Sequence, residues 1–310
     1  METKISVVVP VWNREKLIER CLDSIHSQSL KPYELIVVDN NSTDSTYEVV
    51  VSWINRHKDS PIRFKLLREE KKGACAARQK GLENSEGSFI SFFDSDDEMR
   101  PDLIEKASKI LESRTGVDIV CWKSRIHQLD GSTRVLPFLP QSPIEGHLIH
   151  TLLRPQGYIV RKEVIERAGG WRKSIEVWND FELGLRLLFE NPVIAGIDDV
   201  LAEIYSQEDS ITGLNFSSKV GKWEKTLEEM IKVNENGNHP QKEKIRKILN
   251  YRKAILGAHY YKEGNINEAQ RLLQNVTQNA GLWEKRILKL SYHYTKRGWR
   301  GVWNIVRYLY

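Results

Sequence analysis

An acidic run directly behind an apolar segment constrains this chain more than any other feature. Asp94, Asp96 and Asp97 stand within four residues, immediately after the apolar segment Ser88–Phe93. Carboxylates at this density repel one another, so a cation is expected to neutralise them. Oxygen ligands with open water positions suit Mg²⁺ or Mn²⁺, and these ions commonly bridge to substrate phosphates. The alternative interpretation is a solvated acidic loop.

Apolar segments that predict strands alternate with segments of helical spacing through the first 122 residues. The predicted strands are Ile5–Val9, Leu35–Val38, Ile62–Leu67, Ser88–Phe93 and Val117–Trp122. Helices are expected between them, with caps at Asn13 and at residues 41–43 and a start near Pro101. This alternation predicts an α/β fold, in which helices flank a mainly parallel sheet.

The pattern loosens after residue 123 and becomes wholly helical from Asn215. In the looser part we expect an antiparallel strand at Arg134–Leu139 and further strands at Gly157–Val160, Val193–Ile197 and Leu201–Tyr205. Two helices are expected there, at Lys162–Ala168 and Asn179–Glu190. Residues 256–273 match one tetratricopeptide-like unit, which predicts a helical hairpin packed on the first domain, because a solenoid needs about three repeats. The predicted domains are residues 1–213 and a C-terminal helical region, 214–310.

Cysteine usage and hydropathy indicate a protein kept in the cytosol. The three cysteines are widely spaced, with no pair separated by two residues, which argues against a zinc ribbon or a disulfide framework. The N-terminal apolar segment is too short for a signal peptide, and no apolar stretch reaches the roughly 18 residues of a membrane span.

Charge is distributed unevenly along the chain. Residues 1–214 carry 28 Lys and Arg against 34 Asp and Glu, whereas residues 215–310 carry 19 against 8. Such asymmetry suggests that the second part meets a polyanion or an anionic membrane. Nucleic-acid binding is not expected, because the basic residues form no recognisable module.

Polar side chains follow several predicted strands at the point where each strand ends. Residues 10–13 follow the first strand, Asp39 follows the second, and the acidic run follows the fourth. Ligands of parallel sheets bind beyond these carboxyl ends, so we expect one shared site there. A carboxylate in the position of Asp39 can hold a ribose or a base imide. Neither a GxGxxG nor a GxxxxGK[ST] motif is present, which argues against a nicotinamide dinucleotide fold and a P-loop NTPase.

Four segments in register resemble the successive signatures of family 2 glycosyltransferases with the GT-A fold. The resemblance covers about residues 4–210, and the segments are residues 7–13, 38–44, 73–81 and 93–97. It implies an inverting enzyme of bacterial-type polysaccharide or cell-surface glycan biosynthesis. Such an enzyme would transfer sugar from a nucleotide-diphosphate donor, UDP-linked by preference, to a hydroxyl of a glycan or lipid-linked acceptor, with Mn²⁺ or Mg²⁺.

The same resemblance implies roles for individual residues. Asp96 would ligate the metal, and Asp180 would be the catalytic base. The implied donor-binding residues are Pro10, Trp12, Asn13, Asp39, Asn41, Arg78, Asp94 and Ser95. An acid in the first turn of a helix, favoured there by the helix dipole, is the plainer interpretation of Asp180.

The sequence also departs from the family pattern. Asn179 stands where a Glu often precedes the basic Asp, and the family's Arg-Asn-x-Gly becomes Arg78-Gln79-Lys80-Gly81. Gln207 occupies the place of a histidine near a late strand, so the metal would be held by Asp96, the diphosphate and water, with weaker retention.

The last 26 residues form a basic tail with two open interpretations. Residues 285–310 hold seven Lys and Arg and no acid, and one helix face would carry Trp299, Val302, Trp303, Val306 and Tyr310. Aromatic and basic residues on one helix suit a membrane interface, here the inner face of the membrane. A terminal helix packed on its own domain fits equally well.

Two other functions compete with glycosyl transfer. A sugar nucleotidyltransferase shares the sheet type but needs a Gly-rich phosphate loop after the first strand, which Pro10-Val11-Trp12-Asn13 does not provide. A non-catalytic polyanion-binding protein would use the basic second part and would make Asp180 incidental.

Overall fold

The structure is a computed structural model of the chain. It describes residues 3–137, 142–207, 216–237, 239–299 and 303–306. The chain divides into two compact units. The first comprises residues 1–141 and 152–209, and the second comprises residues 142–151 and 210–310.

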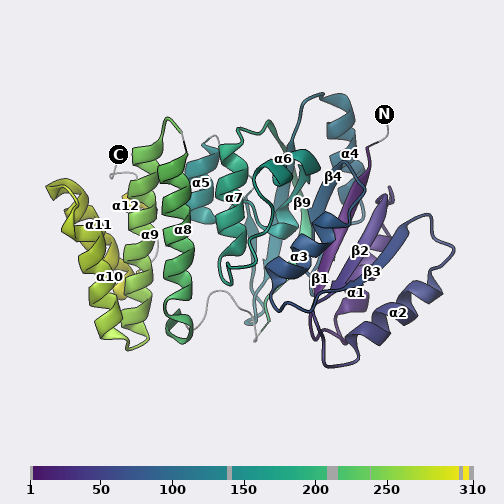
Figure 1. The fold of residues 1–310 in the computed structure, drawn as a ribbon, viewed down its shortest axis with the longest axis horizontal. Helices are drawn as coiled ribbons and strands as arrows, with labels where there is room; N and C mark the ends of the chain where they lie inside the picture. Colours follow the sequence, from purple (N-terminus) through teal and green to yellow (C-terminus); the bar gives the residue numbers. More distant parts are fainter. Residues whose placement is uncertain (1–2, 138–141, 208–215, 238, 300–302, 307–310) are drawn as a thin grey trace. The chain divides into compact units, whose positions relative to one another are not determined.

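A nine-stranded mixed sheet forms the centre of the first unit (Figure 1). Its strands are β1 (Ile5–Val11), β2 (Glu34–Asp39), β3 (Arg63–Arg68), β4 (Phe89–Phe92), β5 (Glu98–Met99), β6 (Ile119–His127), β7 (Thr133–Leu136), β8 (Tyr158–Arg161) and β9 (Ile194–Tyr205). Their order is β3-β2-β1-β4-β8-β6-β9-β5, and β7 pairs with β6. β1, β2, β3 and β4 run parallel, as the alternation predicts.

Helices cover the two faces of this sheet. They are α1 (Ile18–His26), α2 (Thr46–Arg56), α3 (Ala74–Glu83), α4 (Leu103–Ser113), α6 (Lys162–Arg167) and α7 (Asn179–Phe189). Buried side chains of α1, α2 and α4 share a core with Val7 and Val9 of β1. Val8 points the other way, toward α3, where a Cβ on Gly81 would come within 2.2 Å of Val8 Cγ1. The glycine therefore allows α3 to lie directly on the sheet.

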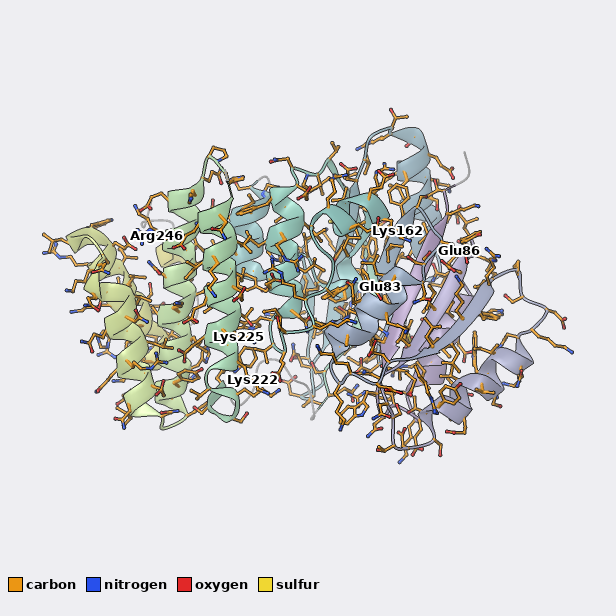
Figure 2. All side chains as sticks on the ribbon, viewed as in Figure 1. Glu83, Glu86, Lys162, Lys222, Lys225 and Arg246 are labelled. Carbon is orange, nitrogen blue, oxygen red and sulfur yellow. The ribbon has the colours of Figure 1, made fainter. Side chains whose placement is uncertain are left out.

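Charged side chains protect the open edge of the sheet at β3. Glu86, labelled in Figure 2, accepts hydrogen bonds from Arg63 and Lys65, both at 2.7 Å. Lys65 also pairs with the buried Glu34 at 2.8 Å. Charged side chains along an edge strand discourage pairing with a second sheet.

The predicted strands and helices are confirmed where the structure describes them, with several corrections, and residues 138–139 of the predicted strand Arg134–Leu139 lie outside the described residues. The predicted short strands at 193–197 and 201–205 are one strand, β9, with register shifts opposite Trp122 to Ser124. β8 lies antiparallel between β4 and β6, a direction that the sequence leaves open. The sequence predicts neither β5 nor the helix at Pro143–His150. The predicted caps are also wrong, since α1 follows Leu17 and α2 follows Ser45. The polar side chains of those loops bond across to each other instead.

The second unit is helical. It contains α5 (Pro143–His150), η2 (Phe216–Lys219), α8 (Lys222–Asn236), α9 (Lys242–Lys262), α10 (Ile266–Gln278), α11 (Leu282–Lys296) and α12 (Trp303–Val306). α9 and α10 form the predicted hairpin, in which a Cβ on Gly257 would lie 3.2 Å from the Ala269 carbonyl oxygen. Lys244 of α9 pairs with Glu145 of α5 at 2.7 Å, so this short helix groups with the second unit. The domain boundary at residue 213 stays a prediction.

Membrane-spanning character is absent from the helices in the described ranges. None of them is both long enough and apolar enough to cross a bilayer.

Candidate active site

Asp39 ends β2 with one carboxylate oxygen unsatisfied. Its side chain is buried, the Ser42 backbone N–H donates to Oδ2 at 3.3 Å, and Arg68 Nε lies 3.9 Å from the same oxygen. Oδ1 is buried and has no hydrogen-bond partner among the described residues. A buried acceptor without a donor is costly, so a ligand N–H or O–H at this position would stabilise it.

Asn13 ties the loop after β1 to the loop after β2. Its Oδ1 accepts the Thr43 backbone N–H at 2.8 Å, and its own backbone N–H donates to Ser42 Oγ at 3.0 Å. Asn13 and the exposed Asn41 both adopt positive φ, 50° and 64°. Pro10 is buried within β1, whereas Trp12 is 51% exposed and available to a ligand. The structure therefore places Asn13 in the contact between the two loops and Pro10 inside the strand that precedes them.

Asp94 is held from two sides at the end of β4. Arg78 Nη2 donates to Asp94 Oδ1 and Gln156 Nε2 donates to Asp94 Oδ2, both at 2.6 Å. The same Gln156 nitrogen also donates to Asp97 Oδ2 at 2.6 Å, while the Tyr205 backbone N–H donates to Asp97 Oδ1 at 2.9 Å. One side-chain amide thus bridges two carboxylates of the acidic run.

The carboxylates of the acidic run repel one another most strongly around Asp97. Burial raises the pKa of the Asp97 carboxyl well above its usual range, and the charges of Asp94 and Asp96 raise that pKa further. Asp96 is less enclosed and lies 3.5 Å from Arg14 Nε, while Ser95 beside it is buried. Mutual repulsion of this kind favours binding of an additional cation.

The residues present fit a divalent ion shared with a substrate. No group of three or more His, Cys, Asp or Glu side chains suited to a metal occurs in the described parts of the chain. A site of this composition would therefore take ligands from Asp96 and from phosphate oxygens, as Mg²⁺ sites commonly do. Gln207, in the place of the family's histidine, donates only a long 3.5 Å bond to the Tyr205 carbonyl.

Arg78 connects the acidic run to the start of α7. Its guanidinium is buried, lies 4.7 Å from the Trp171 ring centre, and donates to Asn179 Oδ1 at 3.2 Å. Asn179, the departure from the family's Glu, is thus a neutral acceptor for Arg78. This contact brings Asp94 and the first turn of α7 to the same edge of the sheet.

Asp180 lies in the first turn of α7. Its Oδ1 accepts the Phe181 backbone N–H at 2.9 Å, so the first-turn interpretation and a chemical role are compatible. The side chain is half-buried. Burial raises the pKa of Asp180, while Arg154 and Arg78 oppose that rise. A carboxylate with a raised pKa is a stronger proton acceptor when ionised.

A buried ion pair fixes the turn that precedes α7. Glu182 accepts two bonds from Arg186, at 2.8 and 2.7 Å, and Arg186 in turn donates to the Gly170 carbonyl at 2.8 Å. Gln79 Oε1 accepts the Trp171 backbone N–H at 2.8 Å, and a Cβ on Gly170 would lie 2.4 Å from that oxygen. Gln79 therefore has a structural role in this chain, which positions Trp171 over Arg78.

The sequence singles out neither Gln156 nor Arg154, and it indicates Trp171 only as part of the turn Gly169-Gly170-Trp171 before Asp180. All three lie in the segment between residues 123 and 178, where loop residues interrupt any regular pattern. Only Pro155 and Gly157 indicate an ordered turn there. They are the first and last residues of the 3-10 turn η1 (Pro155–Gly157) and flank Gln156. The site residues singled out in the sequence do gather at one edge, through the contacts of Asn13, Arg14 and Arg78.

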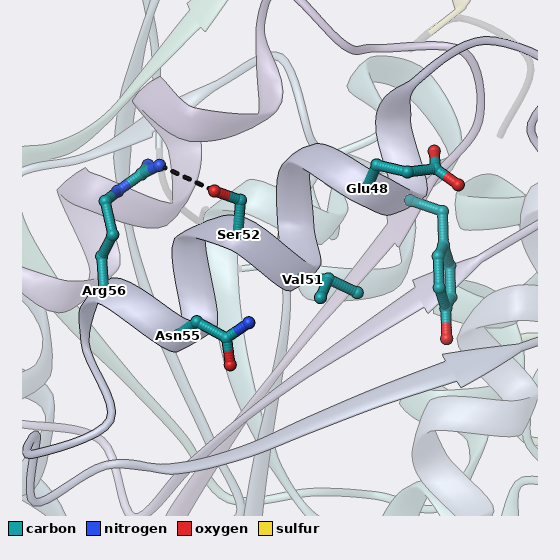
Figure 3. A pocket seen from close by; sticks show the side chains of 6 residues that line it. Glu48, Val51, Ser52, Asn55 and Arg56 are labelled. Carbon is teal, nitrogen blue, oxygen red and sulfur yellow. Dashed lines mark hydrogen bonds between the residues drawn. The ribbon is translucent and has the colours of Figure 1, made fainter.

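A separate hollow lies along the outer face of α2 (Figure 3). It is lined by Tyr47, Glu48, Val51, Ser52, Asn55 and Arg56. All six come from one helix, and Arg56 is hydrogen-bonded to Ser52 at 3.2 Å. A surface built from one helix face brings no groups together from different elements, so we assign it no chemistry.

A model described as "Glycosyl transferase family 2" matches residues 6–167 of this chain. Among curated proteins, a GalNAc(5)-diNAcBac-PP-undecaprenol beta-1,3-glucosyltransferase of Campylobacter jejuni is 38% identical over 96 residues, 31% of this chain and 30% of that protein. The matched parts span from 17% to about half of the length of the first curated relatives.

Two groups of solved structures have the same fold. TarS 1–349 of S. aureus in complex with UDP-GlcNAc superposes with a TM-score of 0.69 at 18% identity, covering 98% of this chain and 90% of that one. A mannosyltransferase of Pyrobaculum calidifontis, PcManGT, in complex with GDP-Man and Mn²⁺, gives a TM-score of 0.61 at 20% identity, covering 100% and 86%. At these identities the likeness establishes the GT-A fold of this chain.

Proposed function

The chain belongs to glycosyltransferase family 2, and from this premise we propose that it transfers a sugar from a nucleotide-diphosphate donor to a hydroxyl group. The donor is a UDP-sugar and the acceptor is a glycan or a lipid-linked glycan. The UDP-GlcNAc complex of TarS and the undecaprenol-linked substrate in the name of the Campylobacter relative support these choices. The reaction is a single, inverting displacement.

The observation that carries this proposal is the link that Arg78 makes between two polar clusters. It contacts Asp94 of the acidic run and Asn179, the neighbour of Asp180. A donor held at the acidic run would thus present its sugar near a carboxylate suited to accept a proton. Neither a nucleotidyltransferase nor a polyanion-binding protein requires this arrangement, and the family match also argues against both.

Donor binding follows from the acceptors at the strand ends. The unsatisfied Asp39 Oδ1 accepts an N–H of the base, and the exposed Trp12 flanks the base. Asp94, fixed by Arg78, faces the ribose. Asp96 would hold Mn²⁺ or Mg²⁺ together with the donor diphosphate, and such an ion would supply positive charge to stabilise the leaving group. Asn13, Asn41, Pro10 and Ser95 shape the loops around the donor.

Asp180 acts as the general base. A sugar hydroxyl is a weak nucleophile at neutral pH, and a carboxylate within hydrogen-bond reach increases the rate about 10²–10⁴-fold by accepting its proton. Burial raises the pKa of Asp180, which makes its carboxylate a better proton acceptor, and Arg154 and Arg78 oppose part of that rise. We place the reaction at the cytoplasmic side of the membrane, with residues 285–310 contacting an anionic lipid surface.

The test compares two variants in a manganese-dependent transfer assay with a panel of UDP-sugars. Asp180→Asn should lower kcat about 10²–10⁴-fold and leave donor binding intact. Asp96→Asn should instead weaken manganese-dependent donor binding, measured by calorimetry. Glu176→Gln, at an exposed site in the same unit, is the control. Unchanged turnover in Asp180→Asn would overturn the base assignment, and unchanged manganese dependence in Asp96→Asn would overturn the metal assignment.

A further inference from the structure

The outward face of α11 in the second unit exposes both apolar and basic side chains. Its exposed residues, with Arg297 just beyond the helix, are Leu282, Trp283, Arg286, Lys289, Leu290, His293 and Arg297. The opposite face is buried, and Ile287, Leu288 and Tyr292 lie in the core of the unit. Exposed and buried positions therefore separate cleanly around the helix, as expected for a helix with one outer surface.

The exposed side chains form two parallel lines along the helix. Trp283, Leu290 and the half-buried Tyr294 follow one another at intervals of seven and four residues, and the Tyr294 ring contacts Trp299 edge-on at 5.0 Å. A basic line runs beside them, with Arg286, Lys289, His293 and Arg297 at intervals of three and four. We call this combined surface the α11 face.

Acidic side chains do not neutralise the α11 face. Glu284, the one acid of α11, is buried and pairs with Arg246 of α9, labelled in Figure 2, at 3.3 Å. Arg286 and Lys289 take part in no ion pair among the described residues. Arg286 and Lys289 therefore present their charges to solvent.

This chemistry favours a lipid surface over other occupants. A second copy of the chain docking through the same face would set its cations against one another. A nucleic acid would use the cations but gain little from exposed leucine and tryptophan side chains. An anionic bilayer can bind the basic and the apolar side chains together. Lys and Arg contact its headgroups, while Trp, Tyr and Leu enter the interface.

We infer that the α11 face docks the protein on an anionic membrane surface. This inference rests on the proposed function, because a lipid-linked acceptor is presented at such a surface. It also differs from the sequence interpretation, which placed the apolar contact at residues 299–310. Val306 is buried in the structure, Trp299 is exposed, and Val302 and Tyr310 lie outside the described residues. The docking surface thus begins earlier, at Leu282 and Trp283.

The first experiment neutralises the basic line. Co-sedimentation of the full chain is measured with phosphatidylcholine vesicles, with and without phosphatidylglycerol. Arg286→Gln/Lys289→Gln should lower the partition coefficient on anionic vesicles about 25-fold, since each cation contributes roughly a factor of five. Lys222→Gln/Lys225→Gln, which removes the same charge from α8 (Figure 2), should leave the partition coefficient within about twofold.

The second experiment removes one apolar side chain at a time. Leu290→Ser should lower partition roughly fivefold, because a half-exposed leucine gains part of its transfer free energy in the interface. Ile266→Ser on α10 is the matched control, since Ile266 is 46% exposed and Leu290 is 51% exposed. Equal effects of the two serine variants, or of the two glutamine pairs, would overturn the inference.

Two further outcomes would also overturn it. One is binding to single-stranded RNA, lost in Arg286→Gln/Lys289→Gln, without binding to vesicles. The other is a dimer in light scattering that the same variant dissociates. Hydrolysis of UDP-sugar in solution separates this inference from the proposed function, because the α11 variants should retain it. If the wild-type chain binds vesicles but turns over no donor, the proposed function fails and the docking surface stands.

Discussion

At the scale of single residues, the charge balance of the site depends on a few neutral and cationic side chains. Arg78 is the only described cation that bonds directly to the Asp94 carboxylate, and Gln156 supplies neutral donors to both Asp94 and Asp97. Burial and the neighbouring carboxylates together raise the pKa of Asp97. An amide in this position satisfies two carboxylates without adding a positive charge to the run.

Gln156→Glu should therefore damage donor binding more than turnover. The change removes two hydrogen bonds to carboxylates, each contributing about 1.5–3 kcal/mol, and adds a third acid. We expect the KM for the donor to rise roughly tenfold to a hundredfold, with a smaller change in kcat, in steady-state assays at several manganese concentrations.

Gln79→Glu is the matched control for that experiment. Gln79 accepts the Trp171 N–H through Oε1, which a glutamate retains, and its other bond goes to the exposed side chain of Glu83. If Gln156→Glu lowered kcat by the same factor as it raised KM, Gln156 would have a general structural role. The same conclusion would follow if Gln156→Glu and Gln79→Glu changed kcat and KM alike.

At the scale of elements, close packing of α3 on β1 positions Arg78. The Val8 methyl groups occupy the space that a Cβ on Gly81 would need. Arg78 lies one helical turn before Gly81, so any displacement of α3 also moves the guanidinium that holds Asp94.

Gly81→Ala should consequently lower the free energy of unfolding by about 1–3 kcal/mol, the usual cost of overpacking a core. Urea denaturation followed by tryptophan fluorescence measures this change. Gly281→Ala is the control, because a Cβ there would meet no atom within 4 Å. Stability equal to that of the control would mean that α3 does not pack on β1 as described.

Short-range sequence patterns predict the strands and helices whose residues follow one another along the chain. Continuous apolar runs such as Ile5–Val9 and Leu35–Val38 identify buried parallel strands, and Asp39 and the acidic run were located because each follows one. The position of β8 between β4 and β6 depends on pairing between distant segments, which no local pattern encodes. Gln156 and Arg154 could not be predicted as site residues for the same reason. They lie just before β8 and reach the site through the pairing of that strand.

At the scale of the whole molecule, the two units carry different parts of the proposed activity. The acidic first part contains the acidic run, Asp39 and Asp180, whereas residues 215–310 carry the excess of Lys and Arg. In the proposed function the first unit binds the donor, and the α11 face of the second holds the enzyme at the surface where its acceptor resides. This proposal gives the charge asymmetry of the sequence a separate purpose in each unit.

A crystal structure of the chain with manganese and a UDP-sugar, with anomalous difference density to locate the metal, tests the central claim most directly. The account predicts a manganese peak about 2 Å from an Asp96 carboxylate oxygen, with the base against Asp39 and the sugar facing Asp180. A metal bound away from residues 94–97, or a nucleotide seated elsewhere, such as along α2, would contradict it.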